Sequence, residues 1–209
     1  MSLPQIYLIS PPSFELASFA KRLDNSLKTG LVPIFQLRLK DYNEIEVKNI
    51  ALRLQKICQQ NNCKFVINDF HNVALDIGAD GVHLGADDAD ILSVRKNSPH
   101  NFFIGASCYD SKDLAVKAVK DGADSISFGA FFTSNTKKSR GRPDVGILEW
   151  ATKEISKPIS VIGGIDVLNC RTFLPYKVDY LCIISAIWNH AKGEVFAIKE
   201  ISDCLKLDH

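Results

Sequence analysis

Three polar side chains alternate with two leucines in one short segment of the chain. Gln36, Arg38 and Lys40 stand at every second position, and Leu37 and Leu39 lie between them. In an extended strand this spacing puts the polar groups on one face and the leucines on the other. A buried arginine requires an acidic partner or an anionic ligand. We therefore interpret the polar face as one wall of an anion-binding site, and an amphipathic surface strand is the alternative.

Two aspartates follow other strand-like segments. Asn68 and Asp69 end one such segment, and Asp88 follows the next one. Carboxylate and amide oxygens can hold a hard cation such as Mg²⁺ together with the phosphate oxygens of a substrate. Both aspartates also precede helical patterns, where a capping carboxylate is expected in any protein. A metal site and helix capping are therefore equally open, and we interpret the nearby His83 as a core histidine.

A dense basic cluster follows the strand-like segment Asp124–Gly129. Its cations are Lys137, Lys138, Arg140 and Arg142. The hydroxyls of Ser134 and Thr136 precede all four cations, and hydroxyl donors beside several cations suit a polyphosphate. A solvated basic loop is the alternative, because runs of like charge are usually exposed. We expect the segment Asn135–Arg142 to be mobile without ligand and to close over a bound pyrophosphate.

Small residues follow the last two strand-like segments. Their sequences are Ile162-Gly-Gly-Ile165 and Ile184-Ser-Ala-Ile187. Glycine-rich backbone after one strand, with a short helix start after the next, is the usual phosphate cradle of barrels built from alternating strands and helices. The alternative is that the glycines only permit a turn. An earlier segment with small residues on one face also ends in a hydroxyl, that of Ser107.

Strand-like and helical patterns alternate along the whole chain, which predicts the element that carries each of these residues. Strands are expected at Gln5–Ser10, Ile34–Lys40, Lys64–Asn68, Gly81–Leu84, Phe102–Ser107, Asp124–Gly129, Ile159–Ile162 and Tyr180–Ile184. Helices are expected at Ser13–Lys28, Tyr42–Asn61, Val73–Ile77, Ala89–Arg95, Ser111–Lys120, Gly146–Ile155, Val167–Leu174 and Val195–Leu205. Short connections imply parallel strands, so we predict an α/β fold in which residues 1–209 form a single (β/α)8 TIM barrel. An open doubly wound sheet is the alternative, although no Gly-x-Gly-x-x-Gly follows the first strand.

Composition limits the classes of function. The chain has 209 residues, 46% hydrophobic content and a formal net charge of +1, which argues against a general nucleic-acid surface. No apolar run is long enough to span a bilayer and the N-terminus lacks a signal pattern, so we expect a cytoplasmic protein without membrane partners. The six cysteines include no C-x-x-C pair, which makes zinc or dithiol redox chemistry unexpected.

Taken together, these segments resemble the thiamine phosphate synthase (thiamine-phosphate pyrophosphorylase) family from Ile6 to Trp188. The motifs that carry the resemblance are Gln36-Leu-Arg-Leu-Lys40, Asn68-Asp69, Gly78-Ala-Asp-Gly-Val-His-Leu-Gly85, Gly105-Ala-Ser107, Ser134-Asn-Thr-Lys-Lys138, Ile162-Gly-Gly-Ile165 and Ile184-Ser185. The resemblance implies a Mg²⁺-dependent transferase that joins hydroxymethylpyrimidine pyrophosphate to a thiazole phosphate and releases pyrophosphate. Both substrates are small molecules, and homo-oligomer formation stays open.

The resemblance also implies a role for each motif residue. The pyrimidine pyrophosphate would contact Gln36, Arg38, Lys40 and Asn68. Mg²⁺ would be held by Asp69 and Asp88. The catalytic residues that hold the pyrophosphate would be Lys137 and Ser107. The thiazole phosphate would contact Ser134 and Thr136 together with the backbone of Gly164, Ile184 and Ser185.

Two other functions stay open at this point. A related thiazole tautomerase shares the barrel, but it needs a positioned base such as histidine, and Tyr109 stands where the family often has one. A non-catalytic phosphate-binding barrel would keep the glycine-rich cradle and have no use for Asp69 and Asp88. Ala86 and Thr133 are further departures from the usual family pattern and leave substrate affinity open.

Overall fold

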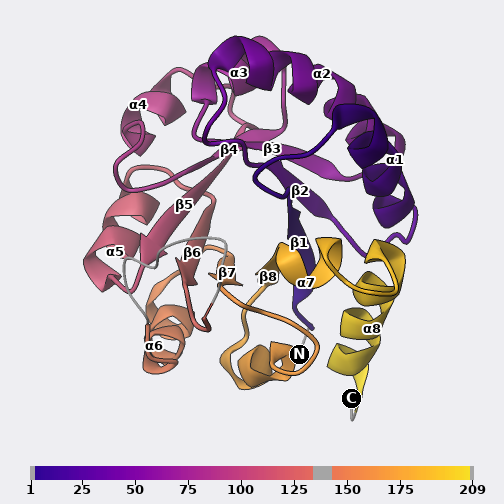
Figure 1. The fold of residues 1–209 in the computed structure, drawn as a ribbon. Helices are drawn as coiled ribbons and strands as arrows, with labels where there is room; N and C mark the ends of the chain where they lie inside the picture. Colours follow the sequence, from indigo (N-terminus) through magenta and orange to yellow (C-terminus); the bar gives the residue numbers. More distant parts are fainter. Residues whose placement is uncertain (1–2, 134–142, 208–209) are drawn as a thin grey trace.

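Eight parallel strands form a closed barrel in this protein. The computed structural model describes residues 3–133 and 143–207. The strands pair in chain order, and the last one returns to pair with the first. Helices surround the strands on the outside, as Figure 1 shows. The predicted (β/α)8 barrel is confirmed.

Most elements lie within a few residues of their predicted positions. The strands are β1 (Gln5–Ile9), β2 (Ile34–Leu37), β3 (Lys64–Asn68), β4 (Gly81–Leu84), β5 (Phe103–Tyr109), β6 (Ser125–Gly129), β7 (Ile159–Ile162) and β8 (Tyr180–Ile183). The helices are α1 (Leu16–Leu27), α2 (Glu44–Gln60), α3 (His71–Asp76), α4 (Ile91–Lys96), α5 (Lys112–Lys120), α6 (Gly146–Glu154), α7 (Ser185–Trp188) and α8 (Glu194–Lys206). The helix predicted at Val167–Leu174 is instead a 3-10 helix, η1 (Cys170–Tyr176), which contains Pro175. A proline inside a helix removes a backbone donor and disfavours regular α-helix there.

The apolar residues fall into two packed groups. The larger one fills the space between the strands and the helices, with fully buried side chains such as Phe35, Phe65 and Phe128. The smaller one lies inside the barrel and includes Tyr7 and Phe103. In residues 3–133 and 143–207, no helix is both long and apolar enough to cross a membrane.

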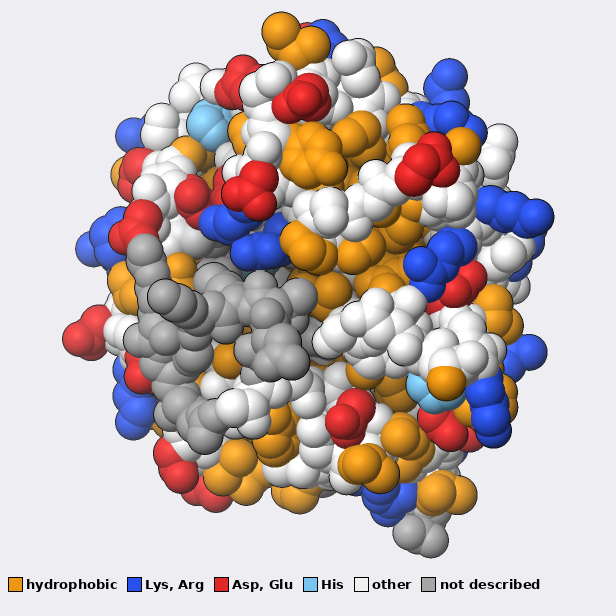
Figure 2. Space-filling view, in the orientation of Figure 1, with side chains coloured by type: hydrophobic (Ala, Val, Ile, Leu, Met, Phe, Trp, Pro, Cys, Tyr) orange, Lys and Arg blue, Asp and Glu red, His pale blue; other side chains and the backbone are white. Residues whose placement is uncertain are grey.

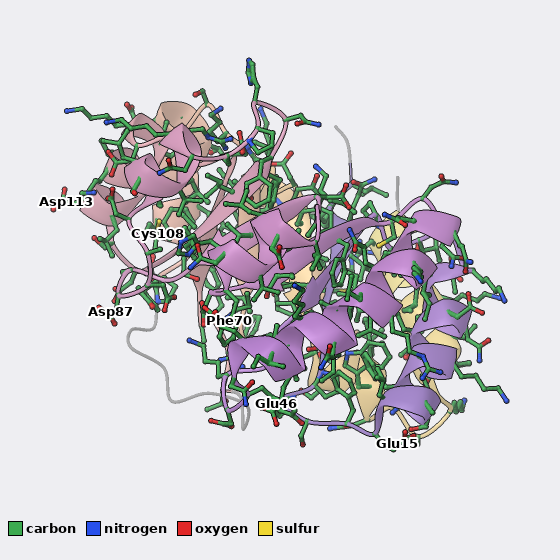
Figure 3. The ribbon with its side chains drawn as sticks, turned by 90° about the horizontal axis from the view of Figure 1, so that it is seen from above. Glu15, Glu46, Phe70, Asp87, Cys108 and Asp113 are labelled. Atoms are coloured by element: carbon green, nitrogen blue, oxygen red, sulfur yellow. The ribbon has the colours of Figure 1, made fainter. Side chains whose placement is uncertain are left out.

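The helix starts near the carboxyl ends of β1 and β2 are held by side-chain caps. Glu15 accepts hydrogen bonds of 2.7 Å from the backbone N–H groups of Ala17 and Ser18. Asn43 and Glu46 form a capping box at the start of α2, and Figure 3 shows Glu15 and Glu46 along the same edge of the molecule. Capping satisfies backbone donors that would otherwise lack partners at a helix start. The loops that follow β1 and β2 are thereby fixed where they enter α1 and α2.

Three aspartates join neighbouring strands at the amino-terminal end of the barrel. Asp80, Asp124 and Asp179 each stand just before an even-numbered strand and accept a hydrogen bond from a backbone N–H near the start of the preceding strand. These bonds are 2.7 Å to Phe65 N, 2.9 Å to Ile104 N and 2.8 Å to Ile159 N. In the repeated Gly-Ala-Asp sequence at residues 78–80 and 122–124, the glycine therefore ends a helix and the aspartate joins two strands.

Replacing Asp124 with alanine should destabilise the fold. The variant leaves the backbone N–H of Ile104, a fully buried residue, without its carboxylate partner, and it removes the ion pair with Arg95. An unsatisfied buried donor costs about 1–3 kcal/mol. Urea unfolding should show this loss for Asp124→Ala, whereas Asp203→Ala, which removes only an exposed ion pair with Lys206, should leave the unfolding midpoint almost unchanged. Equal midpoints for the two variants would contradict this role of Asp124.

Candidate active site

A cavity of about 190 Å³ opens at the carboxyl ends of the strands. The residues that the sequence singles out and that line it are Gln36, Arg38, Lys40, Asn68, Asp69, Asp88, Ser107, Gly164, Ile184 and Ser185. Parallel strands in a closed barrel bring their carboxyl ends to one face, which explains why residues so far apart in sequence meet here. Ser134, Thr136 and Lys137 lie outside the described residues.

The first wall of the cavity continues beyond the end of a strand. β2 ends at Leu37, and the predicted strand to Lys40 was too long. Arg38 nevertheless keeps its place because Ser10, at the end of β1, accepts a 2.9 Å hydrogen bond from its backbone N–H. Gln36 is buried, Arg38 is half-buried and Lys40 is exposed. The three polar groups therefore run from the floor of the cavity to its rim.

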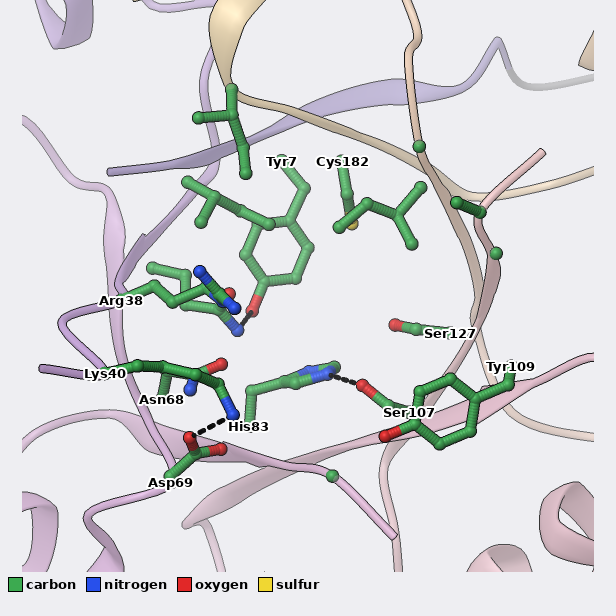
Figure 4. A pocket seen from close by; sticks show the side chains of 18 of the residues that line it. Tyr7, Arg38, Lys40, Asn68, Asp69, His83, Ser107, Tyr109, Ser127 and Cys182 are labelled. Carbon is green, nitrogen blue, oxygen red and sulfur yellow. Dashed lines mark hydrogen bonds and ion pairs between the residues drawn. The ribbon is translucent and has the colours of Figure 1, made fainter. Parts of the chain in front are cut away.

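The two aspartates meet at this rim. Asp69 Oδ2 lies 2.9 Å from Lys40 Nζ, and Figure 4 shows this ion pair at one side of the cavity. Asp88 Oδ2 accepts a 2.7 Å hydrogen bond from the backbone N–H of Gly85. Asp69 adopts a left-handed backbone conformation with φ of 65°, which asparagine and aspartate tolerate better than most residues.

The contact between the two carboxyl groups raises the pKa of Asp69 and lowers the pKa of Asp88. Burial, followed by the hydrogen bond with Asp88, raises the pKa of Asp69 to about 6 against the lowering effect of Lys40. Burial alone would raise the pKa of Asp88, but its hydrogen bonds with Asp69 and with the N–H of Gly85, together with nearby positive charge, hold its pKa below the ordinary value. Below a pH of about 6 the pair therefore holds one proton between its two carboxyls, and above it both are ionised and repel each other.

This carboxylate pair fits a hard divalent cation. Within the described ranges, no group of three or more His, Cys, Asp or Glu side chains could hold a metal by itself, and among these residues the candidate carboxylate ligands are the two aspartates. Mg²⁺ is commonly held in this way, by one or two carboxylates with substrate phosphates and water completing its shell. A cation would also offset the repulsion between the two carboxylates when both are ionised. The donor set therefore fits the metal that the sequence resemblance implies.

The floor of the cavity contains a tyrosine that the sequence analysis did not single out. Tyr7 is fully buried, and Gln36 Nε2 donates to its hydroxyl at 3.4 Å. Burial raises the pKa of Tyr7 well above its usual range, so the phenol stays protonated. Alternation in β1 could have revealed it, since Tyr7 and Ile9 point into the barrel while Ile6 and Leu8 pack against the helices.

His83, predicted from the sequence to be a core histidine, also lies on the cavity wall. Its Nε2 atom is 2.8 Å from Ser107 Oγ, as Figure 4 shows. The alternation within β4 contained the signal, because Val82 and Leu84 belong to the core outside the barrel and His83 must then face inward. Ser107 reaches the cavity from the neighbouring strand β5.

The glycine-rich wall packs closely against the end of β6. Gly164 has a φ of 63°, and a Cβ atom there would lie 2.5 Å from the carbonyl oxygen of Thr133 and 2.9 Å from Phe132 Cβ. Asn169 Nδ2 donates to the carbonyl of Gly164 at 2.9 Å and fixes this turn from the other side. Ser185 opens the short helix α7 on the neighbouring wall. Glycine is thus required at position 164 by both conformation and space.

The comparisons with known proteins agree with this arrangement. The sequence model of a family described as thiamine monophosphate synthase matches residues 6–187. The chain belongs to this family. The thiamine phosphate synthase resemblance in the sequence is therefore confirmed.

Relatives of the thiamine monophosphate synthase family match over nearly the full chain. A thiamine-phosphate synthase of Rhodospirillum centenum is 33% identical, over 97% of this chain and 98% of its own length. One from Pelagibacter ubique is 38% identical over 90% of each chain. The solved structure of a thiamine phosphate pyrophosphorylase from Pyrococcus furiosus superposes with a TM-score of 0.82 at 28% identity, covering 97% of this chain and 95% of that one.

A substitution at Gly164 should act on one side of the thiamine monophosphate synthase cavity. Gly164→Ala forces Thr133 or the glycine turn to move. The family resemblance implies that thiazole phosphate binds at this turn, so the KM for thiazole phosphate should rise by about tenfold or more, because displacements near 1 Å carry effects of this size. The KM for the pyrimidine substrate should change much less.

Gly78→Ala is a matched control, because Gly78 has nearly the same φ, 64°, and nothing within 4 Å of the added Cβ. Steady-state kinetics with each substrate varied in turn would measure both variants. Equal increases in both KM values for Gly164→Ala would indicate a general folding defect and remove the cradle from the account.

Proposed function

We propose that this protein is a thiamine phosphate synthase that joins hydroxymethylpyrimidine pyrophosphate to thiazole phosphate and releases pyrophosphate. The observation that carries the proposal is that a wall with basic side chains and a glycine-rich wall line one cavity, and each suits an anion. One wall presents Arg38 and Lys40 beside the carboxylate pair, and the other presents the glycine turn and Ser185. A transferase with two phosphorylated substrates needs both walls within reach of one another.

The floor of the cavity suits a flat heteroaromatic ring. Ile9 and Ile162 supply apolar surface there, and Gln36 supplies an amide held by the Tyr7 hydroxyl. An amide offers both a donor and an acceptor, which matches the ring nitrogen and amino group along one edge of the pyrimidine. In the proposed complex Gln36 therefore orients the ring, and Asn68 lies above it on the path to the diphosphate.

The diphosphate in the proposed complex lies along the rim. Arg38 and Lys40 donate to its oxygens, and Ser107 adds a hydroxyl from the opposite side. Asp69 and Asp88 would hold Mg²⁺, which supplies positive charge where the departing pyrophosphate becomes more negative. Family likeness adds Lys137 to this set and assigns Ser134 and Thr136 to the thiazole phosphate; all three lie outside the described residues.

The proposed reaction needs no nucleophile from the protein. The pyrimidine carbon loses pyrophosphate, and the thiazole nitrogen forms the new bond to it. Cys182, the thiol on the cavity wall, is buried, and burial raises its pKa to about 12. A thiol that is protonated at neutral pH is a poor nucleophile. The role of the described residues is to bind, to orient and to exclude water from the reactive pyrimidine.

We also propose that the partners are small molecules in the cytoplasm. Acidic and basic side chains are interspersed on the face shown in Figure 2, and the chain carries a net charge of only +1. Nucleic-acid binding favours a continuous basic surface instead. The two phosphorylated substrates need only the local positive charge inside the cavity.

The test of the proposed function is turnover with each component omitted in turn. The full mixture of both substrates with Mg²⁺ should give thiamine phosphate. Conversion of the thiazole compound alone, without the pyrimidine, would indicate a tautomerase. Binding of both ligands without any product would indicate a non-catalytic phosphate-binding barrel.

A further inference from the structure

His83 and Ser107 form a polar pair across two neighbouring strands of the barrel. His83 lies on β4 with 9% of its surface exposed, and Ser107 lies on β5. Both line the cavity, and 2.8 Å separates His83 Nε2 from Ser107 Oγ. In Figure 4 the imidazole lies between Asn68 and Ser107, with its edge toward the serine. The serine hydroxyl is therefore held from the side of β4.

The neighbouring backbone is built around this histidine. Gly105 is the residue of β5 that pairs with His83 in the register of the two strands. A Cβ atom on Gly105 would lie only 2.5 Å from His83 Nδ1. Glycine leaves the space that the imidazole ring occupies. The position of the ring thus depends on two strands.

Ser107 has a single hydroxyl hydrogen, which it can donate either to His83 or to an anion in the cavity. A serine hydroxyl has one hydrogen to donate and two lone pairs to accept. If the hydroxyl donated to His83, only lone pairs would face the cavity, and they would repel an anion. If His83 Nε2 carries a hydrogen and donates to Ser107 Oγ, the serine hydrogen is available to a phosphate oxygen. An anionic ligand therefore requires the second arrangement, and the bonds in such a chain strengthen one another.

We propose that His83 is a positioning residue for the diphosphate site. Its Nε2–H donates to Ser107 Oγ and turns the serine hydrogen toward the leaving pyrophosphate. This inference rests on the proposed function for the identity of the anion. It adds a residue that acts on the diphosphate through Ser107.

A double-mutant cycle on pyrophosphate binding tests the inference. Calorimetry with inorganic pyrophosphate and Mg²⁺ would measure Kd for the wild type, His83→Leu, Ser107→Ala and the double variant. Each single substitution should weaken binding by about tenfold, the usual scale for a hydrogen bond to a charged group. Since His83 acts through Ser107, the double variant should bind no more weakly than Ser107→Ala.

Two further variants separate positioning from packing. His83→Gln keeps an N–H donor near the position of Nε2 and should recover most of the affinity that His83→Leu loses. Gly105→Ala must displace the ring and should weaken binding to the same degree as His83→Leu. His100→Leu, the same change at an exposed residue before β5, should have no effect. Nitrogen-15 NMR of the pyrophosphate complex should show His83 with hydrogen on Nε2.

Additive losses in the double variant would overturn the inference, because they would show that His83 contributes without Ser107. A pyrophosphate complex with Nε2 unprotonated would overturn it as well. If His83→Leu does not fold, Gly105→Ala in the wild-type and Ser107→Ala backgrounds gives the same comparison. Failure of the proposed function would look different: the coupling would persist in pyrophosphate binding while thiamine phosphate is never formed.

Discussion

Asp69→Asn should reduce turnover by at least about a thousandfold, a loss of several kcal/mol in transition-state stabilisation. The substitution keeps the size of the side chain and its tolerance of the left-handed backbone at φ 65°, but it removes one of the two carboxylates proposed to hold Mg²⁺. Initial rates of thiamine phosphate formation across a Mg²⁺ titration would measure the loss. Asp76→Asn, at an exposed ion pair with Lys48, is the matched control and should keep full activity.

The same substitution should stabilise the protein in the absence of ligands. The pKa of Asp69 is about 6 in the folded protein, above its ordinary value of 3.8. A carboxyl whose pKa is raised by folding contributes stability at pH below 3.8, and this contribution is lost as pH rises through 6. Ionised Asp69 therefore costs stability at pH 8, and asparagine should recover up to about 1 kcal/mol there.

Thermal unfolding at two pH values tests this expectation. Without Mg²⁺, Asp69→Asn should melt above the wild type at pH 8 and close to it at pH 4. A variant that melts below the wild type at pH 8 would show that the ion pair with Lys40 outweighs the cost of the carboxylate pair. Retention of most turnover, or full wild-type activity in excess chelator, would remove the metal from the mechanism.

Arg38→Met should raise the KM for the pyrimidine pyrophosphate by about tenfold to a hundredfold, because a hydrogen bond to a charged group contributes about 1.5–3 kcal/mol. Methionine keeps much of the apolar stem and loses the guanidinium group that lines the cavity. The KM for thiazole phosphate should stay nearly constant, since its proposed site is the opposite wall. Steady-state kinetics with each substrate varied would separate the two effects.

Arg53→Met provides the control for this substitution, because Arg53 lies on the exposed face of α2. Its kinetic constants should match those of the wild type. If Arg38→Met affected both substrates equally, or the thiazole phosphate more strongly, the assignment of the two walls would be wrong. Arg38→Met should raise mainly the KM for the pyrimidine pyrophosphate, and Gly164→Ala should raise mainly the KM for thiazole phosphate.

Hydrophobic periodicity was sufficient to predict the barrel and much of the cavity lining. The alternation around Gln36, the apolar run before Asn68 and the glycines after Ile162 each mark the carboxyl end of a strand. Once eight strands are parallel and closed, these ends must share one face. Residues from many segments could therefore be placed in one cavity before any distance was known.

Contacts between strands could not be predicted in the same way. The hydrogen bonds from Asp80, Asp124 and Asp179 to the preceding strands depend on register, which alternation within a single strand does not determine. The pairing of His83 with Ser107 has the same cause, and it depends also on the space above Gly105. Whether Asp69 and Asp88 cap helices or meet each other was equally open in the sequence. The structure shows the carboxyls in contact, and their role toward Mg²⁺ remains a prediction.

The most direct measurement is the ratio of thiamine phosphate formed to pyrophosphate released when the protein acts on both substrates with Mg²⁺. We expect one molecule of each product per turnover, and neither product in excess chelator or when the thiazole phosphate is replaced by buffer. Pyrophosphate released without thiamine phosphate would show hydrolysis of the pyrimidine substrate at an incomplete site. No product from the full mixture, with both ligands bound, would contradict the proposed transferase.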